Sequence, residues 1–284
     1  MGGMTVSRTQ SLALLASALL VPSCAAKAGA VRIGSTDSGE NATVAEIYAL
    51  TLARAGIAIE RYAKLGSENN AMAMLERGDI DLFPGTAGAA GVRNDVVWLT
   101  PSGASDSPCL VTSQYFAEKF WMLTISECAQ LASTLRLAAS PDFLTPGGPL
   151  AGLRRRYGNF QFKSIIQCDP GTQWYAVGRG DAEIANASTT EPGISEERLV
   201  ILDDDRHFWP HRYITPVVRA ASIRVHPRMP SVLNRISHAL SQYALQQMNL
   251  HRRLLNLEPR DVAEEFLRRQ VGVSPHETFA GTPK

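Results

Sequence analysis

The feature that most constrains the fold is an alternation of short apolar strands with helices, beginning at residue 31. Val31–Ser35 is predicted to be a strand, and it leads directly into a predicted helix at Asn41–Ala55. Three more signals follow in the order strand, helix, strand: Ala58–Leu65, Asn69–Arg77 and Ile80–Phe83. This order predicts a parallel sheet with right-handed crossovers, in which ligands bind outside the carboxyl ends of the strands.

The turn between the first strand and the first helix contains Thr36, Asp37 and Ser38. The first N–H groups of a helix have no intrahelical partner, so a strand that ends at a helix N-terminus forms a cradle for a ligand. These three residues are therefore predicted to bind a ligand. Asp37 and Ser38 are suited to an amine or a hydroxyl group.

A second set of strands and helices follows between about Cys109 and Asp205. Its predicted strands are Leu110–Thr112, Leu135–Ala139, Phe162–Gln167, Ala182–Asn186 and Leu199–Leu202. Its predicted helices are Glu127–Ser133, capped by Ser126, then Leu150–Tyr157 and Gln173–Arg179. The chain is expected to return through Tyr213–Arg219 to one long helix, Met229–Gln247, and a shorter one, Asp261–Arg269.

Two α/β units, the second inserted into the first, predict a two-lobed clamp with a binding site between the lobes. Residues 31–108 and 213–284 are expected to form lobe 1. Residues 109–212 are expected to form lobe 2, with crossing segments at both of its ends.

Residues 1–30 have the pattern of a secretory signal peptide. Arg8 supplies the positive charge, and Leu12–Val21 is an apolar stretch of about 10 residues, too short to span a bilayer. Cleavage can follow the small residues 25–30. Alternatively, Val21-Pro22-Ser23-Cys24 resembles a lipobox, which makes Cys24 a candidate for lipidation. The expected location is the periplasm, with the protein either soluble or lipid-anchored through Cys24.

Composition excludes several classes of partner and site. The net charge is +1 and no basic stripe is present, which argues against nucleic acid. No later apolar run is long enough to span a membrane. Apart from Cys24 the cysteines are Cys109, Cys128 and Cys168, whose surroundings show no metal-ligand spacing, so no metal or cofactor is expected. At most one disulfide is possible, and the fold is expected to depend on its apolar core.

Several motifs, in the same order, resemble the osmoprotectant branch of the type II periplasmic binding proteins, over nearly all of the mature chain. These proteins serve ABC importers of glycine betaine, choline and related compounds. The matching segments are Val31-Arg32-Ile33-Gly34-Ser35, Gly78-Asp79-Ile80-Asp81-Leu82-Phe83-Pro84, Trp98-Leu99-Thr100-Pro101, Leu137–Leu144, Leu150–Leu153, Asp169-Pro170-Gly171, Asp203–Phe208 and Pro216-Val217-Val218-Arg219. The resemblance implies a monomeric solute-binding protein that works with an ABC permease and ATPase.

The positions that differ from the family pattern bear on the ligand. Family members that bind quaternary ammonium groups hold the cation in an aromatic cage. Three positions where such members have tyrosine carry Thr86, Ser188 and Arg212 here, and a family tryptophan aligns near Pro108, beside Ser107. Aromatic faces are thus replaced by hydroxyl groups, a proline and a guanidinium.

Arg212 in a cation site would repel a quaternary ammonium. Like charges about 4 Å apart cost on the order of 4 kcal/mol at an effective dielectric constant of 20, whereas each ring contributes only about 0.5–2 kcal/mol. A guanidinium suits a carboxylate instead. The residues therefore predict an anionic or zwitterionic polar solute, with neutral hydrogen bonds from Thr86, Ser188, Thr189 and Thr190. Ser107 is a further candidate binding residue.

Alternatives stay open at this point. A shift of one residue would place Tyr213 at the site, and a relocated cage for betaine or choline could use Trp174, Tyr175 or Trp209. A periplasmic sensor module is a second alternative. An enzyme on the same clamp is disfavoured, because Cys109 has no paired histidine at a specific spacing and no other catalytic constellation is found.

Overall fold

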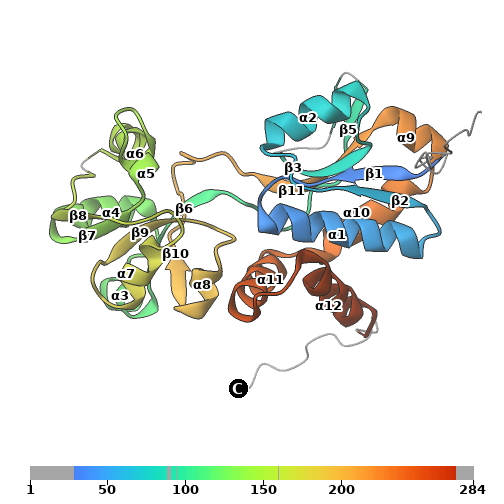
Figure 1. The fold of residues 1–284 in the computed structure, drawn as a ribbon. Coiled ribbons are helices and arrows are strands. Elements are labelled where there is room, and N and C mark those ends of the chain that lie inside the picture. Colours follow the sequence, from blue (N-terminus) through green and yellow to red (C-terminus); the bar gives the residue numbers. More distant parts are fainter. Residues whose placement is uncertain (1–28, 88–90, 94, 159, 273–284) are drawn as a thin grey trace, which may run out of the picture.

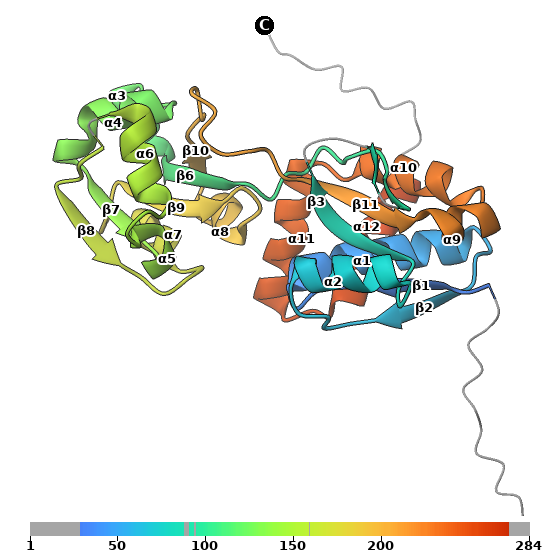
Figure 2. The same cartoon turned by 90° about the horizontal axis from the view of Figure 1, so that it is seen from above.

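The chain forms two α/β lobes joined by two segments that run side by side (Figures 1 and 2). The computed structural model describes residues 29–87, 91–93, 95–158 and 160–272. Cys24 and all but the last two residues of the proposed signal peptide lie outside the described residues.

The first lobe contains a six-stranded sheet in the order β2-β1-β3-β11-β5-β4. Its strands are β1 (Val31–Gly34), β2 (Ile59–Tyr62), β3 (Leu82–Ala87), β4 (Gly91–Arg93), β5 (Val96–Trp98) and β11 (Tyr213–Arg219). β1 is parallel to both β2 and β3, as the sequence predicts, with Val31 opposite Ile59 and Ile33 opposite Leu82. β11 returns from the second lobe and pairs antiparallel with β3 and β5.

Helices cover both faces of this sheet (Figure 1). They are α1 (Gly39–Arg54), α2 (Glu68–Arg77), α9 (Ala220–Val225), α10 (Met229–Ala239), α11 (Gln242–Leu255) and α12 (Pro259–Gly272). The larger core lies between the sheet and α1, α10, α11 and α12, and buries side chains such as Ile47 and Phe266. A smaller core lies under α2, which Gly78 ends in a left-handed conformation with φ 81°.

The single long helix predicted over Met229–Gln247 is wrong, because the chain breaks there into α10 and α11. Leu240 leaves the helical conformation and is buried, and the Ser241 hydroxyl accepts a hydrogen bond from Ala244 N. A serine at this position caps a new helix by satisfying one of its free N–H groups. The break lets α11 change direction and reach the second lobe.

The second lobe contains a five-stranded sheet in the order β10-β6-β9-β7-β8. Its strands are β6 (Pro108–Ser113), β7 (Arg136–Ala139), β8 (Ser164–Gln167), β9 (Ile184–Ser188) and β10 (Leu199–Ile201). Its helices are α3 (Gln114–Phe120), α4 (Ile125–Leu131), the 3₁₀ turn η1 (Ala132–Thr134), α5 (Pro141–Leu144), α6 (Pro149–Tyr157), α7 (Gln173–Gly178) and α8 (Pro192–Glu196). β7 is parallel to β8 and β9, whereas β6 is antiparallel to β9 and β10.

The predicted cap of the helix expected at Glu127–Ser133 is also corrected. Thr124, not Ser126, caps α4: its hydroxyl accepts from Glu127 N, and Glu127 accepts from Thr124 N in return. This reciprocal capping box satisfies two free donors. Ser126 lies inside the first turn, where its N–H donates to Asp205.

The two crossing segments, residues 103–107 and 209–212, contact each other between the lobes. Ser105 forms an isolated antiparallel bridge with Tyr213, and Asp106 N donates to Arg212 O at 3.0 Å. The predicted domain boundaries at residues 108/109 and 212/213 fall within or next to this paired stretch and remain a prediction.

Other features of the described residues bear on chemistry. None of the described helices has both the length and the apolar character needed to cross a membrane. Cys109, Cys128 and Cys168 are free thiols. Burial raises the pKa of the Cys128 thiol to about 12 and the pKa of Cys109 well above its ordinary value, so both are poor nucleophiles at neutral pH. No group of three or more potential metal-ligating side chains occurs in the parts of the chain that the structure describes.

Candidate functional site

Arg212 lies on the return crossing segment, and its backbone is held by the outgoing segment. Arg212 N donates to the Oγ atoms of Ser107 and Ser105, at 3.0 and 3.3 Å, and these two hydroxyl groups are 2.6 Å apart. Ser107 therefore holds the backbone of Arg212 in place, and its hydroxyl group is not free. The arrangement fixes the starting point of the Arg212 side chain.

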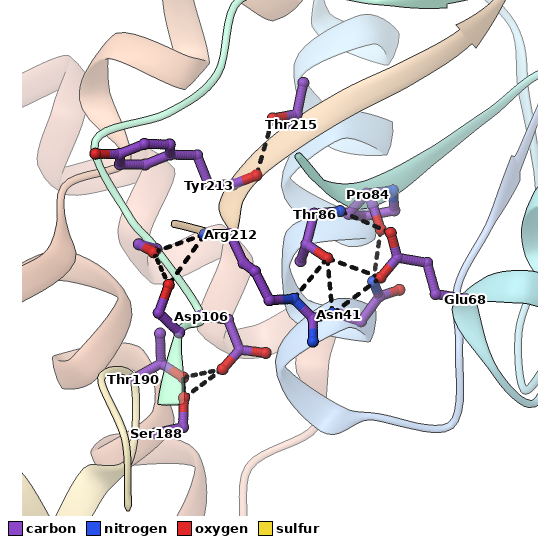
Figure 3. Close-up of polar contacts among 12 residues, drawn as sticks. Asn41, Glu68, Pro84, Thr86, Asp106, Ser188, Thr190, Arg212, Tyr213 and Thr215 are labelled. Carbon is purple, nitrogen blue, oxygen red and sulfur yellow. Dashed lines mark hydrogen bonds and ion pairs between the residues drawn. The ribbon is translucent and has the colours of Figure 1, made fainter. Parts of the chain in front are cut away.

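The Arg212 guanidinium points toward the first lobe, where it meets Thr86 and Glu68 (Figure 3). Arg212 Nη2 donates to Thr86 Oγ1 at 2.8 Å and lies 3.5 Å from Glu68 Oε2. Thr86 N and Thr86 Oγ1 donate to the two Glu68 oxygens at 2.8 and 2.9 Å. Glu68 begins α2, where its carboxylate complements the helix dipole. Arg212 is thus anchored by a partner in the first lobe, yet 47% of its side chain is exposed.

A second polar group surrounds Asp106 on the outgoing segment. The hydroxyl groups of Ser188 and Thr190 both donate to Asp106 Oδ1, the latter at 3.3 Å. Figure 3 shows the Asp106 carboxylate and the Arg212 guanidinium projecting on the same side of the crossing segments. The site therefore presents a guanidinium from one segment and a carboxylate from the other.

Two further carboxyl groups lie near Asp106. Burial, together with repulsion from Asp106, raises the pKa of Glu40 to about 7, although Asn249 donates to its Oε2. Burial also raises the pKa of Glu191 to about 7, and its Oε1 accepts from Ser188 N. Near neutral pH these groups are partly protonated.

In the predicted cradle at the start of α1, many of the polar groups are hydrogen-bonded to other residues of the protein. Thr36 N donates to Asn41 Oδ1 at 3.0 Å, and Asn41 Nδ2 donates to Pro84 O at 2.7 Å. Asp37 Oδ1 accepts from Gly66 N, and the Ser38 hydroxyl caps the helix by accepting from Asn41 N. Thr36 is buried, whereas Asp37 and Ser38 are exposed. A ligand role for these three residues stays a prediction.

Thr189 belongs to the joint between the lobes. Its hydroxyl donates to Ser105 O and accepts from Ser107 N, and its carbonyl accepts from Gln242 and Gln246 of α11, both at 2.8 Å. These bonds connect the second lobe with a helix of the first. Thr189 thus lies beside Ser188, and its hydroxyl group is directed at the outgoing crossing segment.

Each aromatic residue considered for a relocated cage packs against another aromatic ring. Trp174 is 2% exposed, stacks on Tyr175 with ring centroids 3.8 Å apart, and is covered by the Arg253 guanidinium at 5.3 Å. Trp209 packs on Phe208, and Tyr213 stacks on His211. In Figure 3 the Tyr213 ring points away from the Arg212 guanidinium.

Four residues of this region were missed as site residues by the sequence analysis: Asn41, Glu68, Asp106 and Glu40. Asp106 occurs in the stretch Ser105–Pro108 that aligns with a cage position, and Glu68 follows the helix-capping Ser67. These local signals identify turns and caps. They do not show that these four residues lie in one region with Arg212, because this depends on how the two lobes are joined.

The chain is similar to proteins that bind small solutes. A family described as the substrate binding domain of ABC-type glycine betaine transport system matches residues 29–269. The ergothioneine transport permease/ergothioneine binding protein of Helicobacter pylori (strain G27) is 26% identical over 90% of this chain, which spans 50% of that relative. The glycine betaine-binding protein YehZ of Escherichia coli (strain K12) is 24% identical, over 86% of this chain and 91% of the relative.

Solved structures share the fold. A crystal structure described as a glycine betaine/carnitine/choline ABC transporter superposes with a TM-score of 0.79 at 21% identity, covering 85% of this chain and 98% of the other. Ligand-free YehZ from E. coli superposes with a TM-score of 0.75 at 21% identity over the same shares of the two chains. These similarities establish the two-lobed periplasmic-binding-protein architecture that the sequence motifs predict.

Proposed function

The chain belongs to the family of substrate-binding domains of ABC-type glycine betaine transport systems, and from that premise we propose that it binds an anionic or zwitterionic polar solute between its lobes. As a member of this family it is a solute-binding protein and not an enzyme. Its partners are the permease and ATPase of an ABC importer. In this proposal the protein works as a monomer in the periplasm, either free or anchored through Cys24.

The position of Arg212 carries the proposal on the ligand. The guanidinium is anchored to Thr86 and Glu68 through Nε and Nη2, and Nη1 has no hydrogen-bond partner among the described residues. A carboxylate can approach this exposed edge, because a guanidinium presents its N–H groups in a planar fork. Asp106, held by Ser188 and Thr190, is suited to the positive end of a zwitterion.

The two relatives described above are named for ergothioneine and glycine betaine, and both compounds combine a quaternary ammonium with a carboxylate. The relocated aromatic cage is the alternative for such ligands. It is disfavoured because Trp174 is buried against Tyr175, while Trp209 and Tyr213 pack against Phe208 and His211. We therefore expect glycine betaine and choline to bind weakly.

Calorimetry on the wild type and on Arg212→Ala tests the proposal. A thermal-shift screen of polar solutes first identifies the solute that binds, since a ligand stabilises the state to which it binds. This solute is expected to carry a carboxylate, and Arg212→Ala is expected to weaken its binding by about tenfold or more, because a hydrogen bond to a charged group is lost.

The exposed Arg155 in α6 forms no side-chain hydrogen bond or ion pair with another described residue, so Arg155→Gln is the matched control and is expected to bind like the wild type. Tight binding of choline, which has no carboxylate, unchanged in Arg212→Ala, would contradict the proposal. It would favour the relocated cage instead.

A further inference from the structure

A pocket lies between the lobes. It has a volume of about 370 Å³, within the range of small-molecule sites, and is lined by the start of α1, the start of α8 and the C-terminal half of α11. α1 and α11 belong to the first lobe and α8 to the second. Any occupant of this pocket therefore contacts both lobes.

Besides Arg253, whose Nε and Nη2 also have no hydrogen-bond partner but whose guanidinium pairs with Glu196, three side chains lining this pocket contain buried polar atoms without a hydrogen-bond partner among the described residues. These atoms are Asn249 Oδ1, Glu191 Oε2 and Arg252 Nε. Asn249 is only 6% exposed, and its Nδ2 is already used by Glu40 Oε2 and Thr190 O. Because buried polar groups are nearly always paired, three such atoms around one pocket indicate a polar occupant.

The cationic end of the pocket lies where Arg252 meets α1. A Cβ atom on Gly39 would come within 2.5 Å of Arg252 Cζ, so the glycine makes room for the guanidinium on the first turn of this 16-residue helix. The N–H groups of Gly39 and Glu40 have no carbonyl one turn earlier to bond, and the helix dipole is positive here. A guanidinium against the positive end of a helix favours an anion between them.

The other end of the pocket offers acceptors. Asn249 Oδ1 is an acceptor under all conditions, and Glu191 Oε2 is an acceptor when ionised. Arg253, the other arginine of the pocket, is already paired with Glu196 and donates to Tyr175 Oη at 2.6 Å. The pocket is thus suited to an occupant with an anionic group at one end and an N–H donor at the other.

We propose that this pocket binds a second small solute, an amino-acid-like zwitterion whose carboxylate meets Arg252 and the N-terminus of α1 and whose ammonium donates to Asn249 and Glu191. A primary ammonium fits and a quaternary ammonium does not, because the latter has no N–H to offer the two acceptors. The pocket adjoins the group around Asp106, to which its lining residues Glu40, Thr190 and Glu191 also belong, but Arg212 does not line it. Its occupant connects α1 and α11 with α8 and so stabilises one angle between the lobes.

Titrations of the full chain with glycine, glycine betaine, acetate and methylammonium test the proposal. The readouts are calorimetry and the side-chain amide resonances of Asn249. Glycine is expected to bind and to shift these resonances, whereas glycine betaine, acetate and methylammonium bind at least about tenfold more weakly, since each lacks one of the two interactions. Arg252→Gln and Glu191→Gln are each expected to weaken glycine binding by about tenfold.

Arg212→Ala and the surface control Arg155→Gln are expected to retain glycine binding, which separates this pocket from the proposed solute site. Three outcomes would overturn the inference: no probe shifts the Asn249 resonances, glycine betaine binds as well as glycine, or Arg212→Ala abolishes glycine binding while Arg252→Gln does not. The wild-type resonances decide the question even where a variant folds poorly.

Discussion

At the scale of single residues, Glu40 and Glu191 show how burial alters the chemistry of a carboxyl group. Both have an ordinary pKa of 4.5 that burial raises to about 7. In the unfolded chain such a group ionises at lower pH than in the folded protein. The stability that it contributes is therefore fully present below about pH 4.5 and is lost as pH rises toward 7.

We predict that Glu191→Gln raises the free energy of unfolding at pH 8 by about 1–3 kcal/mol, because the buried charge is removed. The gain should disappear near pH 4, where the wild-type carboxyl group is already protonated. Urea unfolding at both pH values measures the difference. Glu76→Gln on the exposed face of α2 is the control and should leave both values unchanged. An equal gain at pH 4 and pH 8 would show that ionisation is not the cause.

At the scale of elements, α8 illustrates how a short helix is held by its neighbours. It lies between α7 and α11, and Gly193 lies directly against the Trp174 ring. A Cβ atom on Gly193 would come within 2.0 Å of ring atom Cδ2. The glycine is therefore required by close packing rather than by backbone conformation.

Gly193→Ala is expected to lower the free energy of unfolding by about 1–3 kcal/mol, since the added methyl group forces the ring and α8 apart. Chemical denaturation followed by tryptophan fluorescence measures the loss. Gly103→Ala is the matched control, because a Cβ atom there meets nothing closer than 3.8 Å. Equal stability of the two variants would mean that Trp174 can move without cost.

At the scale of the whole molecule, the lobes are joined by more than the two crossing segments. α11 adds a third connection, through the bonds of Gln242 and Gln246 to Thr189 O and of Asn249 to Thr190 O. Any change in the angle between the lobes must therefore alter these bonds as well as the crossing segments.

The proposed location of the whole molecule leads to a test in the native host. Mass spectrometry of the mature protein is expected to show the loss of residues 1–23 or of about residues 1–30. In the first case a lipid adduct on Cys24 is expected, and Cys24→Ala should abolish it. Recovery of mature, cell-associated protein that retains Met1 would refute the periplasmic assignment.

The sequence by itself determined the fold class and the family. The spacing of apolar residues, the glycines that end helices and the residues that cap them all act within a few positions of the chain. Local patterns therefore predicted β1, α1, β2, α2 and β3, and the parallel pairing of these strands. The ordered motifs extended this prediction to both lobes. Two predictions were wrong, the cap at Ser126 and the single helix Met229–Gln247. In each case a nearby residue that also suits a helix N-cap, Thr124 or Ser241, begins the helix instead.

Only the tertiary structure decided which polar residues meet. Arg212 and Thr86 are 126 positions apart, and Asn249 and Glu40 are 209 positions apart, so no local pattern connects them. The burial of a side chain also depends on residues far away in the sequence. The sequence makes Trp174 a candidate cage residue, but in the structure it packs against Gly193 and Arg253. A pairing across lobes depends on the angle at which two separately folded units are joined, and this angle is set by contacts that form only after both units exist.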